Sequence, residues 1–178
     1  MDRFSVSVVG DGTIEEGSEK FNIAFEVGKL LSLEGFILIT GGLGGVMEAA
    51  SQGARDNNGM VVGIVPGTKA ETANTYVNIP VATGLGEARN IIVSNSHAII
   101  AIGGGAGTLS EMALGWKQNR LLLGWRGEGW SKKLADKAVD PKPRFTGIKE
   151  DRVFGFDTSK QAMEILKQKM KIYYPNWR

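Results

Sequence analysis

SHAIIAIGGGAGTLSEMALGWKQN, residues 96–119, carries the clearest structural pattern in this chain. It opens with an apolar run, Ala98–Ile102, whose length and β-branched residues are typical of a strand buried on both faces. Three glycines, Gly103 to Gly105, follow this run. From Leu109 the apolar residues recur three and four apart, which is the spacing of an amphipathic helix. The stretch therefore predicts a strand, a glycine-rich turn and a helix.

The glycine-rich turn is suited to hold an anion. Glycine adopts positive φ and has no Cβ atom to block a ligand. The first N–H groups of a helix have no partner within the helix and lie at the positive end of its dipole. We therefore expect a phosphate group there. Thr108 and Glu111 also have the spacing of a capping box, so Glu111 either caps the helix or acts in catalysis.

Strands and helices alternate along the rest of the chain. We expect further strands at residues 4–9, 36–40, 60–65, 77–80 and 121–123, and further helices at 18–33, 46–57, 87–95 and 158–170. Glycine-rich turns follow the first two strands as well, at 10–13 and 41–45, and residues 13–16 form another capping-box candidate. This alternation predicts an α/β fold, namely a Rossmann-like, doubly wound, mainly parallel sheet with helices on both faces.

One Rossmann-like nucleotide-binding domain is expected to span residues 1–178. Residues 124–155 are predicted to be an irregular excursion of mixed basic and aromatic character, and 157–171 a closing helix. A solvated surface segment is a better interpretation of this excursion than a nucleic-acid patch.

The three glycine-rich turns predict one ligand site, because ligands of such sheets bind at the carboxyl ends of the strands. The residues expected to bind the phosphate and the rest of the ligand are Gly10, Gly12, Thr13, Gly41, Gly42, Gly44, Gly45, Met47, Gly103, Gly104, Gly105, Gly107 and Thr108. The carboxylate of Glu111, one turn inside the helix that follows the last of these glycine-rich turns, and Arg89, on the helix before the central strand, are expected beside this site.

Composition excludes several classes of function. The chain has 178 residues, of which 42% are hydrophobic and 22% charged, with a net charge of +2, so a nucleic-acid footprint is not expected. It has no cysteine and a single histidine, His97, which excludes thiolate chemistry and multi-histidine metal sites. We expect no metal and no resident cofactor. No apolar run is long enough to cross a membrane, so we expect a cytoplasmic protein.

Neither the dinucleotide motif G-x-G-x-x-G nor a Walker motif is present at the turns, which argues against NAD-dependent and NTP-hydrolysing enzymes. His97 precedes the central buried strand and is expected to form structural hydrogen bonds.

Three segments together resemble the LONELY GUY, or lysine decarboxylase-like, superfamily: GGLGGVMEAASQGA at 41–54, EARN at 87–90 and GGGAGTLSE at 103–111. The resemblance covers residues 4–123. It implies a Rossmann-like fold, a homodimer or higher homo-oligomer, and hydrolysis of the N-glycosidic bond of a nucleoside 5′-monophosphate to base and ribose 5-phosphate. By this resemblance, Glu111 is the catalytic carboxylate and Arg89 its cationic partner. Lysine decarboxylation is not expected.

This chain also departs from the pattern of these hydrolases. Gly103 stands where they have proline, Ala106 where an aromatic residue is frequent and Ser110 where a second glutamate is frequent. These hydrolases also have an Arg-Lys pair, and in this chain Ala88 aligns with its arginine and Arg89 with its lysine. These departures resemble a branch that includes molybdenum cofactor carrier proteins, which bind a phosphorylated pterin without transforming it. Two hypotheses remain open: a phosphoribohydrolase, or a non-catalytic carrier or sensor of a phosphorylated nucleotide or pterin.

Overall fold

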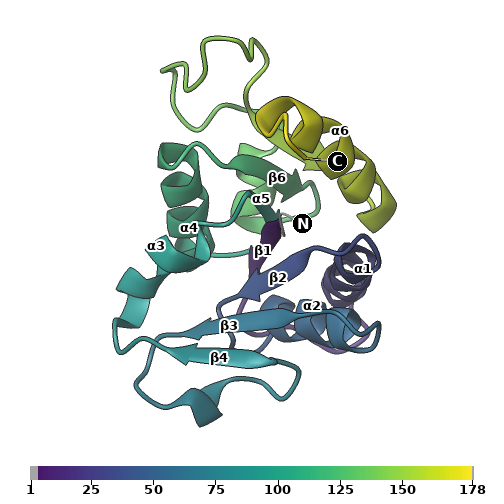
Figure 1. Ribbon diagram of the computed structural model, residues 1–178, viewed down its shortest axis with the longest axis vertical. Coiled ribbons are helices and arrows are strands. Elements are labelled where there is room, and N and C mark those ends of the chain that lie inside the picture. Colours follow the sequence, from purple (N-terminus) through teal and green to yellow (C-terminus); the bar gives the residue numbers. More distant parts are fainter. Residues whose placement is uncertain (1–3, 178) are drawn as a thin grey trace.

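Seven parallel strands form one sheet within residues 4–177, the part of the chain that the computed structural model describes (Figure 1). The strands are β1 (Ser5–Gly10), β2 (Ile37–Thr40), β3 (Val61–Val65), β4 (Ile79–Ala82), β5 (Ala98–Ile102), β6 (Leu121–Trp125) and β7 (Val153–Phe156). Their order is β4-β3-β2-β1-β5-β6-β7, and every neighbouring pair is parallel. The predicted doubly wound, Rossmann-like sheet is therefore confirmed, and its direction of winding reverses between β1 and β5.

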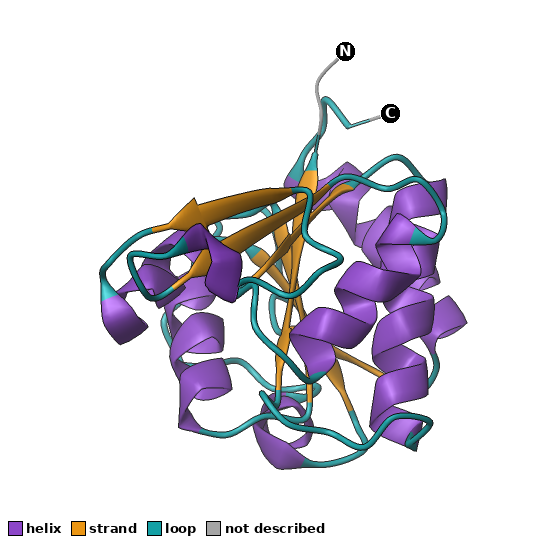
Figure 2. Ribbon diagram, turned by 90° about the horizontal axis from the view of Figure 1, so that it is seen from below, coloured by secondary structure: helices purple, strands orange, loops and turns teal. Residues whose placement is uncertain are grey.

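Helices cover both faces of the sheet (Figure 2). The α-helices are α1 (Glu19–Leu33), α2 (Val46–Arg55), α3 (Asn90–Val93), α4 (Ala106–Lys117), α5 (Gly129–Leu134) and α6 (Ser159–Tyr173). Two 3-10 turns, η1 (Ala70–Thr72) and η2 (Gly86–Arg89), flank β4. Helices α1, α2 and α6 lie on one face, and α3, α4 and α5 on the other (Figure 1).

The central strand β5 divides its side chains between two apolar clusters. Ala98, Ile100 and Ile102 belong to the cluster beneath α1, α2 and α6, whereas Ile99 and Ala101 belong to the cluster beneath α3 and α4. All five residues of β5 are buried, as the apolar run predicts. This follows from the alternation of side chains along a strand that has helices on both sides.

Both capping-box predictions are wrong. Helix α1 begins after Ser18, whose hydroxyl accepts the N–H of Phe21 at 3.2 Å, so Thr13 lies in the preceding loop. Helix α4 begins after Gly105, three residues earlier than expected, so Thr108 is its third residue and not its cap. The buried Thr108 packs against Gly104 instead, where a Cβ would collide with it.

Three further expectations are corrected. The helix expected at 87–95 is the 3-10 turn η2 followed by the single turn α3, and the strand expected at 77–80 is β4, shifted by two residues. Residues 124–155 are not irregular throughout, since they contain α5 and the first three residues of the edge strand β7. The closing helix is α6, and Thr158 caps it by accepting the N–H of Gln161 at 3.2 Å.

The loop between α5 and β7 is fixed by Arg144. Its guanidinium lies 3.7 Å from the ring centroid of Trp116 and makes two hydrogen bonds with Asp151, at 2.6 and 2.7 Å. It also donates to the carbonyl oxygens of Trp116 and Arg120. Because Arg144 and Asp151 are both nearly buried, this pair anchors the loop to α4 in the protein interior.

Candidate functional site

The three predicted turns meet at the carboxyl ends of β1, β2 and β5. Asp11, in the turn after β1, connects them. Its backbone carbonyl accepts the N–H of Val46 at 2.9 Å, and its carboxylate accepts the N–H of Gly104 at 3.0 Å. Gly45 has φ +68, and a Cβ there would collide with the carbonyl oxygen of Asp11. The glycines predicted from sequence therefore come together, around a carboxylate that sequence reasoning missed.

Lys20 adds a second unpredicted charge beside this carboxylate. Its ammonium group, on the first turn of α1, forms ion pairs with Asp11 and with Glu128, the residue that precedes α5. Burial, the largest single effect, lowers the pKa of Lys20, but the hydrogen bonds that its ammonium group donates to these two carboxylates outweigh it and raise the pKa above its ordinary value. Lys20 thus stays charged and holds Asp11 against the glycine-rich turn.

Helix α5 is hydrogen-bonded to the first half of the glycine-rich turn after β5. The Ser131 hydroxyl accepts the N–H of Gly103 at 2.8 Å, and the N–H of Ser131 donates to the Gly103 carbonyl at 3.1 Å. The N–H of Trp130 donates to the Gly104 carbonyl at 3.0 Å. With Asp11 on the N–H of Gly104, every backbone polar group of these two glycines is occupied.

The second half of the turn has free hydrogen-bond donors. The first N–H that bonds within α4 is that of Leu109, which donates to the Gly105 carbonyl at 3.0 Å. The N–H groups of Gly105, Ala106, Gly107 and Thr108 have no acceptor within residues 4–177. They lie at the positive end of the helix dipole, which is the geometry of an anion-binding site.

Gly12, Gly105 and Gly107 are glycines that the fold does not require. None of them has positive φ, and a Cβ at any of them would meet nothing within 4 Å. Gly103 and Gly104, by contrast, have φ of +68 and +93 and face Asp11 and Thr108 closely. Three exposed glycines with open space above them leave room for a ligand to approach the backbone.

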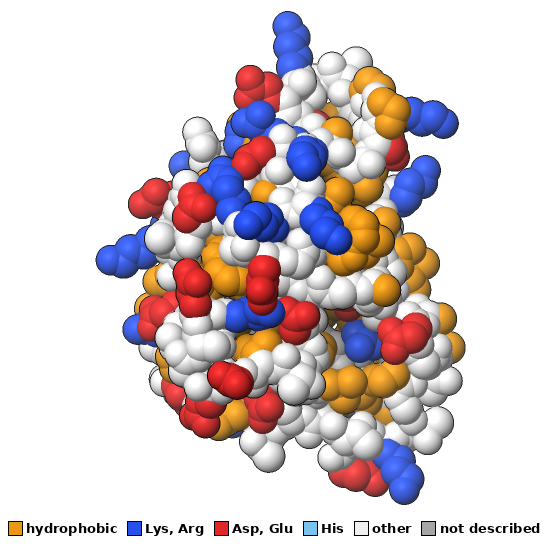
Figure 3. All heavy atoms as spheres, turned by 180° about the vertical axis from the view of Figure 1, so that it is seen from behind, with side chains coloured by type: hydrophobic (Ala, Val, Ile, Leu, Met, Phe, Trp, Pro, Cys, Tyr) orange, Lys and Arg blue, Asp and Glu red, His pale blue; other side chains and the backbone are white. Residues whose placement is uncertain are grey.

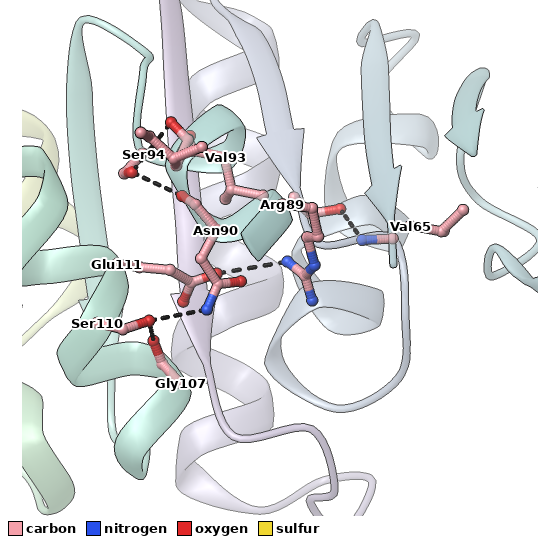
Figure 4. Close-up of polar contacts among 12 residues, drawn as sticks. Val65, Arg89, Asn90, Val93, Ser94, Gly107, Ser110 and Glu111 are labelled. Atoms are coloured by element: carbon pink, nitrogen blue, oxygen red, sulfur yellow. Dashed lines mark hydrogen bonds and ion pairs between the residues drawn. The ribbon is translucent and has the colours of Figure 1, made fainter. Parts of the chain in front are cut away.

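Two polar bridges join the η2–α3 segment to α4 (Figure 4). The Arg89 guanidinium lies 3.5 Å from Glu111 Oε1, and the Asn90 amide donates to Ser110 Oγ at 2.8 Å. Ser110 in turn donates to the Gly107 carbonyl at 2.7 Å. The bridges therefore link the buried pair Arg89–Glu111 to the first turn of α4.

Burial dominates the electrostatics of Glu111. Its exposed fraction is 6%, and desolvation raises its pKa to about 7, an increase that the charge of Arg89 opposes and that of Glu87 assists. Arg89 Nε and Asn90 Oδ1 are also buried and have no partner within the described residues. A carboxyl group that titrates near neutral pH can hold or transfer a proton.

The remaining predicted residues lie around these turns. Gly41 lies under Arg89, where a Cβ would collide with the guanidinium, and the Met47 sulfur packs beside the same position. Thr13 lies exposed in the loop after β1. His97 lies just before β5, at the amino ends of the strands, where Nδ1 accepts the N–H of Ser5 at 3.1 Å, which confirms its structural role.

Within residues 4–177, no cluster of three His, Asp or Glu side chains could hold a metal ion. None of the helices formed by these residues is long and apolar enough to cross a membrane.

Comparison with known proteins places this geometry in a family. The sequence model of the SLOG cluster4 family matches residues 3–153. An uncharacterized protein of Archaeoglobus fulgidus is 45% identical over 121 residues, which are 67% of this chain and 78% of that protein.

Two solved structures match nearly the whole chain. The molybdenum cofactor binding protein of Rippkaea orientalis is 32% identical, with a TM-score of 0.76, over 94% of this chain and 98% of its own. The molybdenum cofactor carrier protein of Chlamydomonas reinhardtii is 31% identical, with a TM-score of 0.75, over the same shares of the two chains.

Proposed function

Since the chain belongs to the SLOG cluster4 family, we propose that it binds a phosphorylated, pterin-like small molecule and carries it without transforming it. The molybdenum cofactor binding protein of Rippkaea orientalis and the carrier protein of Chlamydomonas reinhardtii share the fold over nearly its full length, at more than 30% identity. Their likeness supports a carrier function more than a hydrolytic one.

The free N–H groups at the start of α4 carry this proposal. Residues 105–108 offer four backbone N–H donors at a helix N-terminus. A Cβ atom at Gly105 or Gly107 would meet nothing within 4 Å, so a ligand has room to approach these donors. A phosphate can accept several of these hydrogen bonds together. In this proposal, the phosphate of the ligand lies on Gly105, Ala106, Gly107 and Thr108, and the other turns form the walls of its site.

The backbone at Gly103 also favours the carrier over the hydrolase. The LONELY GUY-like hydrolases that the sequence resembles have proline at this position. Gly103 has φ +68, which proline cannot adopt because its ring fixes φ near −65°. A side chain there would also collide with the carboxylate of Asp11. The turn in this chain therefore follows a path that the hydrolase motif does not allow.

A phosphoribohydrolase of the LONELY GUY type is the second candidate, and Glu111 favours it. Its pKa of about 7 and its contact with Arg89 are properties of a group that can stabilise an oxocarbenium-like transition state or activate water. Incubation with AMP and GMP, followed by detection of free base and ribose 5-phosphate, tests this candidate. Release by the wild type that the Glu111→Gln variant lacks would replace the carrier proposal by the hydrolase.

Binding itself is tested by Gly107→Asp. An aspartate in the first turn of a helix interacts favourably with the helix dipole, and its negative charge repels a phosphate. We expect the variant to unfold no more easily than the wild type, and to lose the thermal stabilisation that GMP or 6-hydroxymethylpterin phosphate gives the wild type. Gly147→Asp, at an exposed loop glycine that also has open space, is the matched control and should retain it. Equal stabilisation of both variants would contradict the phosphate position.

Assembly as a homodimer is part of the proposal. Three exposed apolar residues lie in the segment that carries Arg89, namely Leu85 just before η2 and Ile91 and Ile92 on α3, which supports a second copy as the partner of this face. Light scattering on Ile91→Glu should give a monomer where the wild type gives a dimer. A single domain and a cytoplasmic location stay predictions.

A further inference from the structure

Charge is distributed unevenly along this chain. Residues 117–178 contain 15 of its 21 basic residues but only seven of its 19 acidic ones, which gives this part a net charge of +8 against −6 for residues 1–116. Basic side chains cover much of the upper half of the rear face, while acidic side chains gather over its lower left (Figure 3). A surface that carries one sign of charge steers partners of the opposite sign toward it.

Five cations lie on the segments before and after the edge strand β7, and we call them the basic edge: Lys132, Lys133, Lys137, Arg152 and Lys169. Contacts connect them from α5 to α6. Lys137 donates to the carbonyl oxygen of Lys133 at 2.9 Å, and its own carbonyl oxygen accepts the N–H of Val153 at 2.9 Å. Arg152 and Lys169 both lie over the ring of Phe154, at 5.7 and 4.5 Å from its centroid.

The charge of the basic edge is not neutralised from within residues 4–177. None of its five cations forms an ion pair with a carboxylate of these residues. The nearby carboxylates are engaged elsewhere, since Asp136 and Asp157 pair with Arg126, and Asp151 pairs with Arg144. The basic edge is therefore free to attract an external anion.

The backbone of β7 leaves no room for an added strand at Val153. Its N–H and carbonyl groups are bonded on the outer side to the carbonyl of Lys137 and the N–H of Asp136, at 2.9 and 2.7 Å. The N–H of Gly155 donates to the Asp136 carboxylate at 3.1 Å. A partner must therefore contact the cationic side chains and not the edge of the sheet.

The chemistry of the basic edge favours carboxylates over nucleic acid. Single-stranded nucleic acid stacks its bases on exposed aromatic rings. Here the rings are covered by cations, because Lys133 lies 4.4 Å from the centroid of Trp130, as Arg152 and Lys169 lie over Phe154. Four of the five cations are lysines, whereas arginine is preferred where phosphates are bound bidentately.

Helix α5 joins the basic edge to the glycine-rich turn. The N–H of Trp130 donates to the Gly104 carbonyl at 3.0 Å, and Lys133 covers the ring of the same tryptophan. Negative charges that dock on α5 therefore lie beside the turn. They oppose the positive potential that attracts a phosphate to the free N–H groups of residues 105–108.

We propose that the basic edge docks an acidic surface of a second protein, which receives the ligand, and that this docking weakens the binding of the phosphate. Attraction between opposite charges brings the partner to the helix that adjoins the turn, and the same negative charges repel the phosphate. The docking stands on the charges alone, whereas the effect on the ligand rests on the proposed function.

A fluorescein-labelled, glutamate-rich peptide is the probe for the docking surface, and fluorescence anisotropy measures its affinity for the full chain. The affinity should fall steeply as salt is added, because screening weakens the attraction between exposed charges. Lys132→Glu combined with Lys137→Glu, both at exposed positions, should weaken peptide binding about tenfold or more.

Arg55→Glu combined with Lys69→Glu is the matched control, since it changes the net charge equally. Both residues are exposed and belong to the half of the sheet remote from β7. This variant should weaken peptide binding less than about threefold. Equal weakening by the two double variants would mean that the peptide senses only net charge, and it would overturn the docking surface.

An oligothymidine strand of equal charge and phosphatidylserine vesicles test the other classes of partner. We expect both to bind more weakly than the peptide. If either binds more tightly, and Lys132→Glu with Lys137→Glu abolishes this binding, the basic edge is a nucleic-acid or membrane surface and the proposal is wrong.

Titration calorimetry with GMP, with and without saturating peptide, tests the effect on the ligand. The peptide should weaken GMP binding to the wild type about two- to tenfold, and it should have no effect on Lys132→Glu with Lys137→Glu. Unchanged GMP affinity in the presence of bound peptide would overturn this effect. If neither GMP nor 6-hydroxymethylpterin phosphate binds while the peptide does, the proposed function and the effect on the ligand both fail, and the docking surface stands.

Discussion

Gly107→Ala is expected to stabilise the protein while it weakens the binding of phosphorylated ligands. Gly107 lies in the first turn of α4, without positive φ, and the added methyl group meets no atom within 4 Å. Glycine in a helix costs about 0.5–1 kcal/mol relative to alanine, because it loses more backbone entropy on folding. For a chain of this length, the melting temperature of the unliganded protein should rise by about 1–4 °C.

Gly104→Ala is the matched control for this prediction. Gly104 has φ +93, and a Cβ there would collide with the Thr108 side chain. Strain of this kind costs about 1–3 kcal/mol, so the melting temperature should fall. Differential scanning calorimetry of both variants, with and without GMP, measures stability and ligand stabilisation together. If Gly107→Ala lowers the melting temperature, the fold requires this glycine, and its presence is then no evidence for a ligand at this position.

Three further perturbations test the interior of the site and its support. The pKa of Glu111 is about 7 in the folded protein, above its value in the unfolded chain, so the stability associated with its protonated form is lost as the pH rises from about 4.5 through 7. In urea unfolding, the free energy of unfolding of Glu111→Gln should therefore exceed that of the wild type by an amount that grows between pH 5 and 8, toward about 3 kcal/mol. A difference that stays constant over this pH range would contradict the burial argument. Arg144→Met leaves the buried carboxylate of Asp151 unpaired, which should cost about 3–5 kcal/mol in urea unfolding, and a cost below 1 kcal/mol would show that this pair does not anchor the loop. Ser131→Ala removes the acceptor of the Gly103 N–H and should cost about 1–3 kcal/mol in the same assay, with weaker GMP binding, whereas unchanged stability would mean that α5 does not hold the turn.

Much of the fold could be predicted from local pattern. The run Ala98–Ile102 has the composition and length of a doubly buried strand, and it is one. The period of the apolar residues changes after the glycines, and α4 follows there. Patterns of this kind depend on residues a few positions apart, so they are readable without knowledge of the rest of the chain.

The predictions that failed depended on packing that the local sequence pattern does not specify. Thr108 and Glu111 have the spacing of a capping box, but α4 begins at Ala106, and Thr108 packs against Gly104. Strand β7 was missed because its four residues form an edge strand only through pairing with β6. In both cases the local sequence is compatible with several structures, and packing selects one of them.

The sequence by itself determined the alternation of strands and helices and the gathering of glycine-rich turns at the carboxyl ends of the strands, since both follow from short-range periodicity and from the geometry of parallel sheets. Only the tertiary structure decided which donors remain free. Asp11 accepts the N–H of Gly104 from 93 residues away, and Ser131 accepts the N–H of Gly103 from 28 residues away. The tertiary structure also decided the proton affinity of Glu111, because its pKa depends on burial and on Arg89, and neither can be read from the residues beside it.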